Sequence, residues 1–421
     1  MEPNSTSPQV QPVDPPQTPP APQPSVTPPP SVPPTPFSGS GQTPGQPKPT
    51  RSRLMPVIVA AAVLLAAAGA YGAWTYFQNA NKPATARVKI GVMMAFSGGS
   101  SSMGYGAMKG VQLAKKQLAA DNLEIIQEDS KCDPKVAAES IKRLIEQNVA
   151  AIIGEGCSSA TVAALPAANN AKIPLISPSA SSPTLSNPND YFFRVVPPDT
   201  FQGSFMAQAI YDKGIRNVAV FYTNEPYGSG MNTVFREKFE ALGGKVVATA
   251  SGEPDVIDLG TQITGLKNAK PQAIFVAPNS VVTATAVLKL SREAGMNVPF
   301  FGADIMYDTT IINNAKEASE GLTISSFPTG TKAFKQSLIN EYQKTEQLYA
   351  APQAYDIVRA LQIAVQDGAT TGEQIKNALP NITFEGVSGK IKFDQNGEIS
   401  DKDYKYDLFQ VKDGTFELVS Q

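Results

Sequence analysis

The sequence predicts an α/β protein built from two doubly wound parallel sheets. Three observations support this expectation. From about Arg87 onward, short β-branched runs alternate with longer amphipathic stretches, which is the pattern of strands joined by crossover helices. The pattern restarts at Asn217, so it describes two similar units. About 335 residues of ordinary globular composition follow this start, more than one typical domain contains.

The first 50 residues differ in composition from the rest of the chain. They contain 18 of the 36 prolines and almost no aliphatic side chains. Such a segment cannot bury enough apolar surface to offset the entropy lost on ordering. We therefore expect residues 1–53 to form a disordered, proline-rich cytoplasmic tail. Its proline content is consistent with a polyproline ligand for a cytoplasmic partner, but we favour the interpretation that it is a spacer.

An apolar segment follows this tail. Leu54–Phe77 contains about 24 residues without a charge, enough to cross a bilayer as a helix. Aromatic residues cluster at its far end, and the basic residues Lys48, Arg51 and Arg53 precede it. We expect a transmembrane helix over residues 54–78 with its N-terminus in the cytoplasm, then a linker over 79–86. A cleaved signal peptide is the alternative, because small residues occur near Ala70 and Ala73.

The first unit is expected to contain four strands and three helices. Pro134 suits a first helical turn, because its missing N–H has no partner there in any case. The expected strands are Arg87–Met94, Leu123–Glu128, Val149–Gly154 and Ile173–Ser177. The expected helices are Gly104–Ala120, Pro134–Gln147 and a helix that begins at Ser158.

The second unit repeats the alternation, and Pro197 and Pro198 lie near the junction. Its expected strands are Asn217–Tyr222, Lys245–Ala248, Gln272–Ala277 and Pro299–Phe301. Its expected helices are Tyr227–Leu242, Leu259–Leu266 and Val281–Ala294. After Leu322–Phe327 we expect the helices Thr331–Lys344 and Pro352–Val365, then the strands Lys390–Phe393 and Tyr404–Val411 with a turn at Asn396 and Gly397.

Several function classes are excluded by what the chain lacks. It contains no histidine, which removes Ser-His-Asp and Cys-His catalysis and histidine-ligated metals. The glycine-rich stretch Ser97–Gly110 lacks the Gly-Lys-Ser/Thr of a phosphate-binding loop. The net charge of −2, without a long basic run in the globular part, does not indicate nucleic-acid binding. We expect no enzyme activity, no cofactor and no metal site.

Small hydroxyl residues gather where the strands of the first unit end. They occur in Ser97–Ser102, Cys157–Ser159 and Ser177–Ser182, and ligands bind beyond the carboxyl ends of open parallel sheets. Ser158 or Ser159 is a natural helix N-cap. The free N–H groups there would attract an anion such as a ligand carboxylate, although an ordinary cap without a ligand explains the same residues.

Four other residues are candidates on local grounds. Cys157 could be a nucleophile at a helix N-terminus, but no histidine is present as a base. A disulfide with Cys132 is the better interpretation, because the two cysteines come just after the second and third expected strands, whose ends are close if the strands are neighbours. Asp304 follows a strand and is either a turn aspartate or a carboxylate for a ligand ammonium. Tyr227 opens a helix and either stacks on a ligand or packs.

Together these stretches resemble the type I periplasmic solute-binding proteins of ABC transporters, the leucine/isoleucine/valine-binding family. The resemblance covers about Arg87 to the C-terminus. It is carried by the order and spacing of VKIGVMMAFSG, CDPKVA, IIGEGCSSAT, PLISPSASSPTLS, YTNEPYGSG and FFGADIMYD. It implies two Rossmann-like lobes joined by three crossovers, with the ligand between them. The implied boundaries are 87–198 plus 329–392 for lobe 1 and 199–328 plus 393–421 for lobe 2.

The resemblance also implies roles for single residues. Ser158 and the Ser181 hydroxyl would bind a ligand carboxylate. The Ser179 carbonyl and the Asp304 carboxylate would hold an ammonium, and Tyr227 would close over the ligand. Cys132 and Cys157 match the family disulfide. The chain departs from the family at Met103, Asn279 and Ala350, where aromatic residues are usual or lie nearby, and at Asp304, where the best-known members have Glu.

These features predict a membrane-tethered, extracytoplasmic binding protein with a monomeric ectodomain. It would capture an amino acid or amino-acid-like molecule by hinge closure and deliver it to an ABC permease. The alternative is a ligand-sensing ectodomain that signals to a membrane or cytoplasmic partner, because receptor ectodomains share this fold.

Overall fold

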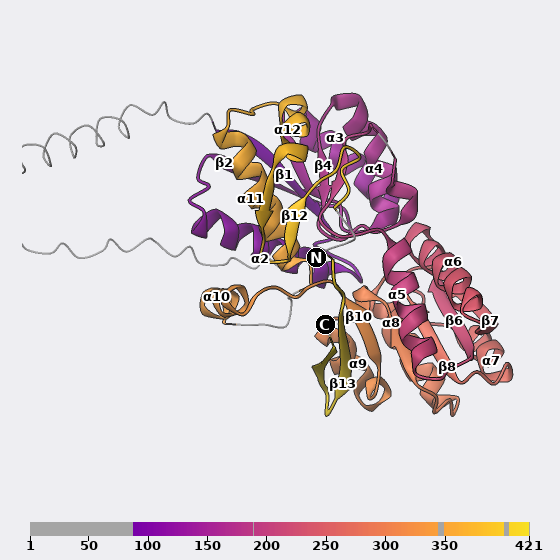
Figure 1. The fold of residues 1–421 in the computed structure, drawn as a ribbon. Coiled ribbons are helices and arrows are strands. Elements are labelled where there is room, and N and C mark those ends of the chain that lie inside the picture. Colours follow the sequence, from indigo (N-terminus) through magenta and orange to yellow (C-terminus); the bar gives the residue numbers. More distant parts are fainter. Residues whose placement is uncertain (1–86, 188, 344–348, 400–403, 421) are drawn as a thin grey trace, which may run out of the picture. The chain divides into compact units, whose positions relative to one another are not determined.

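The computed structural model describes residues 87–187, 189–343, 349–399 and 404–420 (Figure 1). The expected tail (1–53), transmembrane helix (54–78) and linker (79–86) lie outside these residues. Within the described part of the chain, no helix has both the length and the apolar character needed to span a bilayer.

The first lobe is built on a five-stranded sheet with the order β2-β1-β3-β4-β5, and every pairing in it is parallel. β3, β4 and β5 are buried along their whole length, as strands covered on both faces should be. In chain order the strands are β1 (Val88–Met94), β2 (Leu123–Asp129), β3 (Ala151–Gly154), β4 (Leu175–Ser177) and β5 (Phe192–Arg194).

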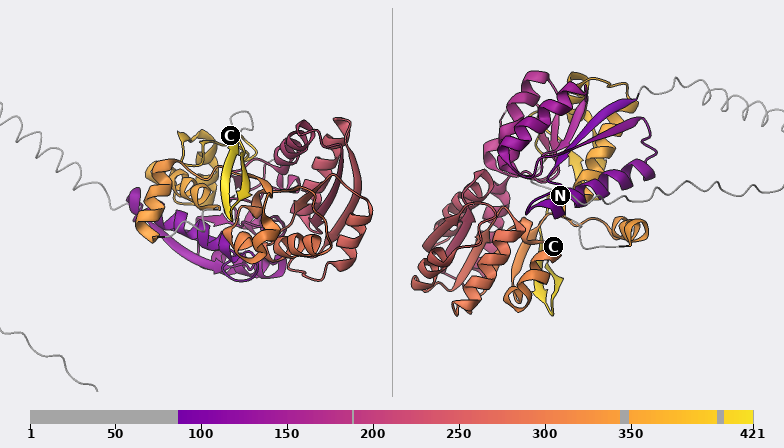
Figure 2. Two further views of the ribbon diagram at one scale, coloured as in Figure 1. Left: turned by 90° about the horizontal axis from the view of Figure 1, so that it is seen from below. Right: turned by 180° about the vertical axis from the view of Figure 1, so that it is seen from behind.

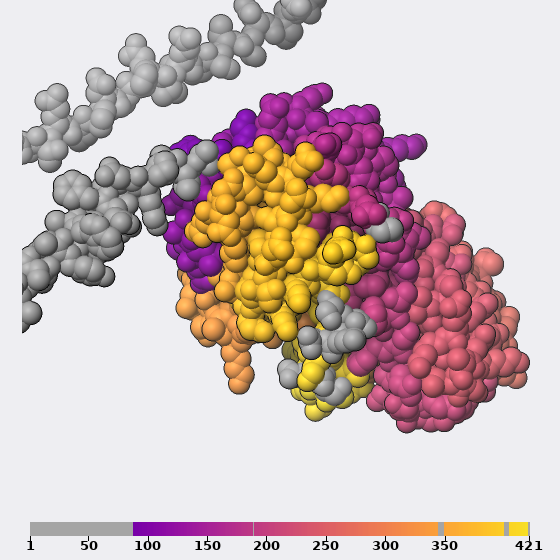
Figure 3. All heavy atoms as spheres, turned by 45° about the horizontal axis from the view of Figure 1, so that its top comes forward, coloured from indigo at the N-terminus to yellow at the C-terminus, as the bar shows by residue number. Residues whose placement is uncertain are grey.

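Helices from both ends of the described chain cover this sheet. Figures 1 and 2 show the orange and yellow α11 and α12 beside the indigo and purple elements, and Figure 3 shows the same proximity on the surface. The helices of this lobe are α2 (Ser101–Gln117), α3 (Pro134–Glu146), α4 (Ser158–Ala171), α10 (Lys332–Tyr342), α11 (Ala351–Gln366) and α12 (Gly372–Ala378). Short 3-10 turns (Pro183–Leu185, Leu379–Asn381) and a hairpin of β11 (Thr383–Glu385) and β12 (Lys390–Lys392) complete it.

Helix α3 shows how the sequence specifies these elements. The Asp133 side chain caps the helix by accepting hydrogen bonds from the N–H groups of Lys135 and Val136, and Pro134 occupies the first helical position. The buried positions Ala137, Ser140, Ile141 and Leu144 follow the three-and-four spacing of one helix face. This face packs in the core of the first lobe.

The second lobe contains a seven-stranded sheet with the order β14-β13-β10-β9-β8-β6-β7. Pairing is parallel from β10 to β7 and antiparallel at β13 and β14. Its strands are β6 (Asn217–Thr223), β7 (Lys245–Gly252), β8 (Ala273–Ala277), β9 (Phe300–Gly302), β10 (Thr323–Ser326), β13 (Asp407–Lys412) and β14 (Thr415–Ser420). Its helices are α5 (Asp199–Asp212), α6 (Pro226–Ala241), α7 (Gly260–Asn268), α8 (Val281–Glu293) and α9 (Thr309–Ala315), with 3-10 turns at Asp304–Met306 and Lys316–Ser319.

The chain passes between the two lobes three times, after β5, after β10 and after β12. Val196, Phe327 and Tyr406, one from each passage, form a small apolar cluster that is separate from the two lobe cores. Phe393 and Ile399 pack in the first core, although the sequence-based boundary assigns them to the second lobe. We therefore propose that the first lobe extends to about residue 400, and not only to residue 392.

Candidate ligand-binding site

Residues that follow the parallel strands of both sheets line one small space. Its volume is about 20 Å³, roughly the room for one water molecule. Six of the seven residues expected to bind a ligand line it, and Ser181 does not. The lining residues are Met103, Gly156, Cys157, Ser158 and Ser179 from the first lobe, Tyr227, Asn279, Asp304 and Ile305 from the second, and Tyr349.

Asp304 is the acidic group of this space. It is 1% exposed and begins the 3-10 turn after β9. The Tyr227 hydroxyl donates to its Oδ1 at 2.8 Å, and the Tyr349 hydroxyl donates to its Oδ2. Burial raises the pKa of the Asp304 carboxyl, and the hydrogen bonds from Tyr349 and Tyr227 oppose this rise. The arrangement provides a buried acceptor suited to a cationic group.

Tyr349 was not predicted from the sequence. The expectation considered the adjacent Ala350, where related proteins have an aromatic residue nearby, but Tyr349 is the residue whose hydroxyl contacts Asp304. Burial, reinforced by the charge of Asp304, raises the pKa of the Tyr349 hydroxyl well above its usual value. The tyrosine is therefore a neutral donor at physiological pH. The available sequence signal was an aromatic residue close to the Ala-Pro pair that begins a helix.

Helix α4 directs its N-terminus toward the same space, but its cap differs from the expectation. Cys157, in an extended conformation, is the N-cap residue and makes no side-chain cap. Ser158 is instead the first helical residue, and its Oγ accepts a hydrogen bond from the Ser182 N–H at 3.1 Å. The expectation of a serine cap was wrong, because the Ser158 hydroxyl bonds to the segment after β4 and not to its own helix. The first N–H groups of the helix still suit an anion.

Ser179 and Met103 form part of the wall that belongs to the first lobe. The Ser179 hydroxyl donates to the Gly156 carbonyl at 3.0 Å and lies 3.3 Å from the Met103 sulfur. Ser181 is 1% exposed, and its hydroxyl has no hydrogen-bond partner among the described residues. Its backbone carbonyl accepts from the Asp199 N–H at 2.8 Å.

A disulfide joins Cys132 and Cys157 with a Cα–Cα distance of 5.5 Å. The cysteines follow β2 and β3, which flank β1 in the sheet and end at the same edge. The Asn279 amide of the second lobe lies 3.8 Å from the Cys132 sulfur. The disulfide is therefore part of the cleft surface as well as a covalent link.

Direct hydrogen bonds hold the lobes together around the site. The Ser100 hydroxyl donates to the Asn279 carbonyl at 3.1 Å, and the Ser182 hydroxyl donates to the Pro226 carbonyl at 2.9 Å. The Ser102 hydroxyl donates to the Asp308 carboxylate. The small volume and these direct contacts between the lobes are typical of a closed conformation.

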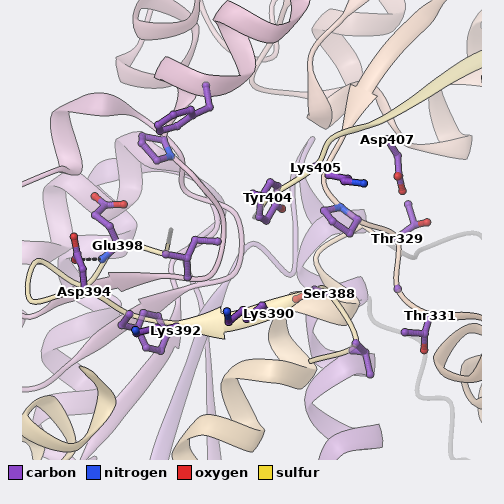
Figure 4. A pocket seen from close by; sticks show the side chains of 18 of the residues that line it. Thr329, Thr331, Ser388, Lys390, Lys392, Asp394, Glu398, Tyr404, Lys405 and Asp407 are labelled. Atoms are coloured by element: carbon purple, nitrogen blue, oxygen red, sulfur yellow. Dashed lines mark hydrogen bonds between the residues drawn. The ribbon is translucent and has the colours of Figure 1, made fainter. Parts of the chain in front are cut away.

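A larger cavity of about 890 Å³ lies among the crossovers, away from the expected residues (Figure 4). It is lined by the second passage near Thr329, the β11–β12 hairpin and the segment around Tyr404 and Lys405. None of the seven expected ligand-binding residues lines it. The convergence of both sheet edges therefore identifies the smaller space as the candidate site.

Comparison with known proteins agrees with this geometry. Residues 87–415 match the family model described as periplasmic binding protein. The chain is 27% identical to the leucine-, isoleucine-, valine-, threonine- and alanine-binding protein of Pseudomonas aeruginosa, over 67% of this chain and 77% of the relative. It is 23% identical to the Leu/Ile/Val-binding protein of Escherichia coli K12, over 76% and 90% of the two chains.

Solved structures show the same fold. A leucine-binding protein of Thermotoga maritima superposes with a TM-score of 0.73 at 26% identity, over 79% of this chain and 98% of that one. A branched-chain amino acid binding protein of Streptococcus pneumoniae, solved with isoleucine, gives 0.71 at 26% identity, over 79% and 99%.

These relatives are named for the amino acids that they bind, and the family is one of binding proteins and not of enzymes. The predicted α/β fold of two doubly wound lobes is confirmed. The chain therefore belongs to the periplasmic binding protein family, in its type I leucine/isoleucine/valine-binding group.

Proposed function

We propose that this protein captures an amino acid or a close analogue between its lobes and delivers it to an ABC-type permease, with its binding region acting as a monomer. One observation carries the proposal. Ser158 and Ser179 from the first sheet edge meet Tyr227 and Asp304 from the second around one small space. Helix N–H groups suit a carboxylate and a buried aspartate suits an ammonium, so the site matches the common frame of amino acids.

The proposed binding order follows from where these groups lie. The ligand carboxylate binds first to the N-terminus of α4 and the hydroxyls of Ser158 and Ser181. The Ser179 carbonyl holds the ammonium on the same lobe. Closure then adds Asp304 and Tyr227 from the second lobe, and a hinge motion of this kind is common in periplasmic binding proteins.

The walls around the ligand side chain favour a small or polar group. Met103 and Asn279 line the space, and Asn279 presents an amide where an aromatic ring would give an apolar wall. One methylene in such a pocket changes affinity by about 1–3 kcal/mol, so these residues would determine preference among amino acids. Relatives bind leucine, isoleucine and valine, but we propose a more polar ligand for this chain.

Thermal-shift screening of the protein amino acids and small amides tests this proposal. A ligand at 100 times its Kd should stabilise the protein by about 2.7 kcal/mol. Titration calorimetry with the most stabilising compound should then show a loss of at least about 100-fold in affinity for Asp304→Asn, because a buried ammonium loses its charged partner.

Asp258→Asn is the matched control for this experiment. Asp258 is an exposed aspartate of the same lobe, and its replacement should leave affinity unchanged. Equal affinity of the wild type and Asp304→Asn would contradict the proposed role of Asp304. A wild-type protein that no amino acid or amide stabilises would overturn the proposed function itself.

We also propose that Leu54–Phe77 tethers the protein to the membrane with its binding region outside the cytoplasm. The length of the apolar segment and the preceding basic residues support this. Carbonate extraction of membranes from cells that express the full chain should leave it in the pellet. Its intact mass should retain the N-terminal 53 residues, and a mature protein that begins after Ala70 or Ala73 would contradict tethering.

A further inference from the structure

Arg194 is a fully buried arginine at the end of β5, and its guanidinium joins two segments of the first lobe. On one side it forms an ion pair with Glu398, Nε to Oε2 at 2.6 Å and Nη2 to Oε1 at 2.7 Å. On the other side it contacts the loop of residues 178–186, which we call the serine loop and which contains Ser181. Among the described residues, no other arginine or lysine is fully buried.

The contacts with the serine loop lie on both sides of Ser181. Nη1 of Arg194 donates to the Ser182 carbonyl at 3.0 Å and lies 3.5 Å from the Ala180 carbonyl oxygen. Nη2 also donates to the Ser186 hydroxyl at 2.6 Å. The Ser181 hydroxyl between these points is buried and has no hydrogen-bond partner among the described residues. The guanidinium therefore fixes the backbone around a hydroxyl that the rest of the described chain does not use.

Glu398 is itself held in place by a turn that packs on β5. The Asp394 carboxylate accepts from the Glu398 N–H at 3.0 Å, and the Gly397 carbonyl accepts from the Arg194 backbone N–H at 3.0 Å. A Cβ on Gly397 would lie 2.2 Å from the Phe192 carbonyl oxygen, so the close approach of this turn to β5 requires glycine. The turn therefore presents the Glu398 carboxylate to Arg194 from a fixed position.

The ion pair does more than the fold requires. The Arg194 side chain is 0% exposed and that of Glu398 is 16% exposed, and the removal of charges from water is costly. Apolar side chains of similar volume often support a fold equally well. They cannot hold backbone carbonyls, whereas a planar guanidinium with five N–H donors binds a carboxylate and a loop at the same time. The use of arginine here thus indicates a need for an exact loop position.

We propose that Arg194 is a positioning residue of the ligand-binding site, which holds the Ser181 hydroxyl in place for the ligand carboxylate, and that Glu398 fixes the direction of its guanidinium. The proposal rests on the proposed function and adds to it two residues that do not touch the ligand. The serine loop also reaches the other hydroxyl that we assign to the carboxylate, because the Ser182 N–H donates to the Ser158 Oγ at 3.1 Å. A shift of the loop would therefore displace both hydroxyls together.

This positioning does not depend on closure of the lobes. The hydrogen-bond partners of Arg194 lie in the serine loop and in the turn at Gly397 and Glu398, and all of them belong to the first lobe. The loop is thus already ordered when a ligand meets the first lobe. Groups that are ordered in advance lose less entropy on binding, which increases affinity.

The test is a double-mutant cycle of Arg194→Lys and Ser181→Ala. Lysine keeps a positive charge beside Glu398, but it offers its donors from one point and not from a fork. Arg143→Lys is the matched control, because Arg143 of α3 in the same lobe also binds a glutamate and a serine hydroxyl, away from the candidate site. The probe is the protein L-amino acid that raises the melting temperature of the wild type most. Titration calorimetry then measures its affinity for each variant.

We expect Arg194→Lys to bind about 5- to 50-fold more weakly than the wild type, and Arg143→Lys to bind equally well. Ser181→Ala should weaken binding by about 3- to 10-fold in the wild-type background, the value of one hydrogen bond. In the Arg194→Lys background the same change should weaken it by less than about twofold, because a displaced hydroxyl contributes little. A merely structural role of Arg194 would leave the two losses independent of each other.

Glu398→Gln is a second variant, to be used in the same cycle if urea unfolding shows that Arg194→Lys is not folded. It retains the guanidinium but replaces one of the two oxygens that hold it with an NH2 group. It should weaken binding by about 2- to 5-fold and reduce the effect of Ser181→Ala.

The outcomes separate this inference from the proposed function. Wild-type affinity in the folded variants of Arg194 and Glu398, or a Ser181→Ala loss that is equal in both backgrounds, would overturn the positioning role and leave the proposed function intact. Wild-type affinity in Ser181→Ala would do the same. A wild-type protein that no amino acid stabilises would overturn the proposed function together with the inference.

Discussion

Glu155 is a fully buried acid directly behind the N-terminus of α4. Its Oε1 accepts from the Ser130 hydroxyl at 2.7 Å and its Oε2 from the Cys157 N–H at 2.6 Å. Burial raises the pKa of the Glu155 carboxyl to about 7, although these hydrogen bonds oppose the rise. Its charge therefore changes close to physiological pH, next to the helix end that we assign to the ligand carboxylate.

We predict that Glu155→Gln removes part of the pH dependence of folding stability. A carboxyl whose pKa is higher in the folded state stabilises the fold fully below its unfolded value of about 4.5, and this stabilisation is lost as the pH rises through about 7. The free energy of unfolding falls by about 3 kcal/mol between these two pH values.

Urea unfolding from pH 4.5 to 8 tests this prediction. The free energy of unfolding should change less with pH in Glu155→Gln than in the wild type. Glu124→Gln, at an exposed position of β2, should keep the wild-type slope, and a steep slope in Glu155→Gln would contradict the prediction.

Site residues were predictable where they follow a strand directly. Ser158 and Asp304 come just after β3 and β9, and the rule that ligands bind at the carboxyl ends of parallel strands applies to both. Tyr349 instead lies just before α11 of the first lobe, and its place near the site depends on how distant segments fold together. The tyrosine before Ala-Ala-Pro marks the start of a helix, but it does not show that the hydroxyl reaches Asp304.

At the scale of elements, α2 and α11 pack so closely that a glycine is required between them. A Cβ on Gly110 of α2 would lie 2.0 Å from the Ala351 carbonyl oxygen at the start of α11. Gly265 of α7 is the opposite case, because a Cβ there would have no atom within 4 Å. The same substitution therefore tests close packing at one helix and helix propensity at the other.

We predict that Gly110→Ala lowers the free energy of unfolding by about 1–3 kcal/mol, because the two helices must move apart. Gly265→Ala should raise it by about 0.5–1 kcal/mol, because alanine loses less backbone entropy in a helix. Urea midpoints of the two variants against the wild type measure both changes. A Gly110→Ala protein with the same free energy of unfolding as the wild type would contradict the prediction, because it would show that the interface between α2 and α11 accommodates the added methyl group.

The elements that sequence analysis omitted share a physical cause. β5 is three residues long and contains Arg194, which is buried only because Glu398, far away in the chain, neutralises it. The buried face of α5 includes Asp199 and Gln202, so its apolar periodicity is weak. β14 was predictable in principle, since Asp413 and Gly414 both adopt positive φ in the tight turn that an Asp-Gly pair favours. The long amphipathic helices and apolar strands were predicted because their signals are local.

For the whole molecule, the function that we propose depends on the balance between open and closed lobes. Closure is held by contacts such as the Ser102 hydroxyl on the Asp308 carboxylate, which join α2 of the first lobe to the start of α9 in the second. We expect such contacts to break when the lobes separate. A substitution at one of them therefore changes the closing equilibrium without touching the ligand or either lobe core.

We predict that Ser102→Asp shifts this equilibrium toward the open state. The new carboxylate would face Asp308, which also caps α9 by accepting from the Thr310 N–H at 2.8 Å. Within its own lobe the substitution is favourable, because an acid in the first turn of α2 complements the helix dipole. Repulsion across the cleft of about 1–2 kcal/mol should weaken binding of the most stabilising amino acid by about 5- to 30-fold.

Small-angle scattering over a ligand titration measures this shift. Both proteins should reach the compact form, but Ser102→Asp should need a higher ligand concentration than the wild type. Ser102→Ala, which removes one hydrogen bond without adding a charge, should lie between the two. Affinity in Ser102→Asp equal to that of the wild type would mean that this contact does not form when the lobes close on a ligand.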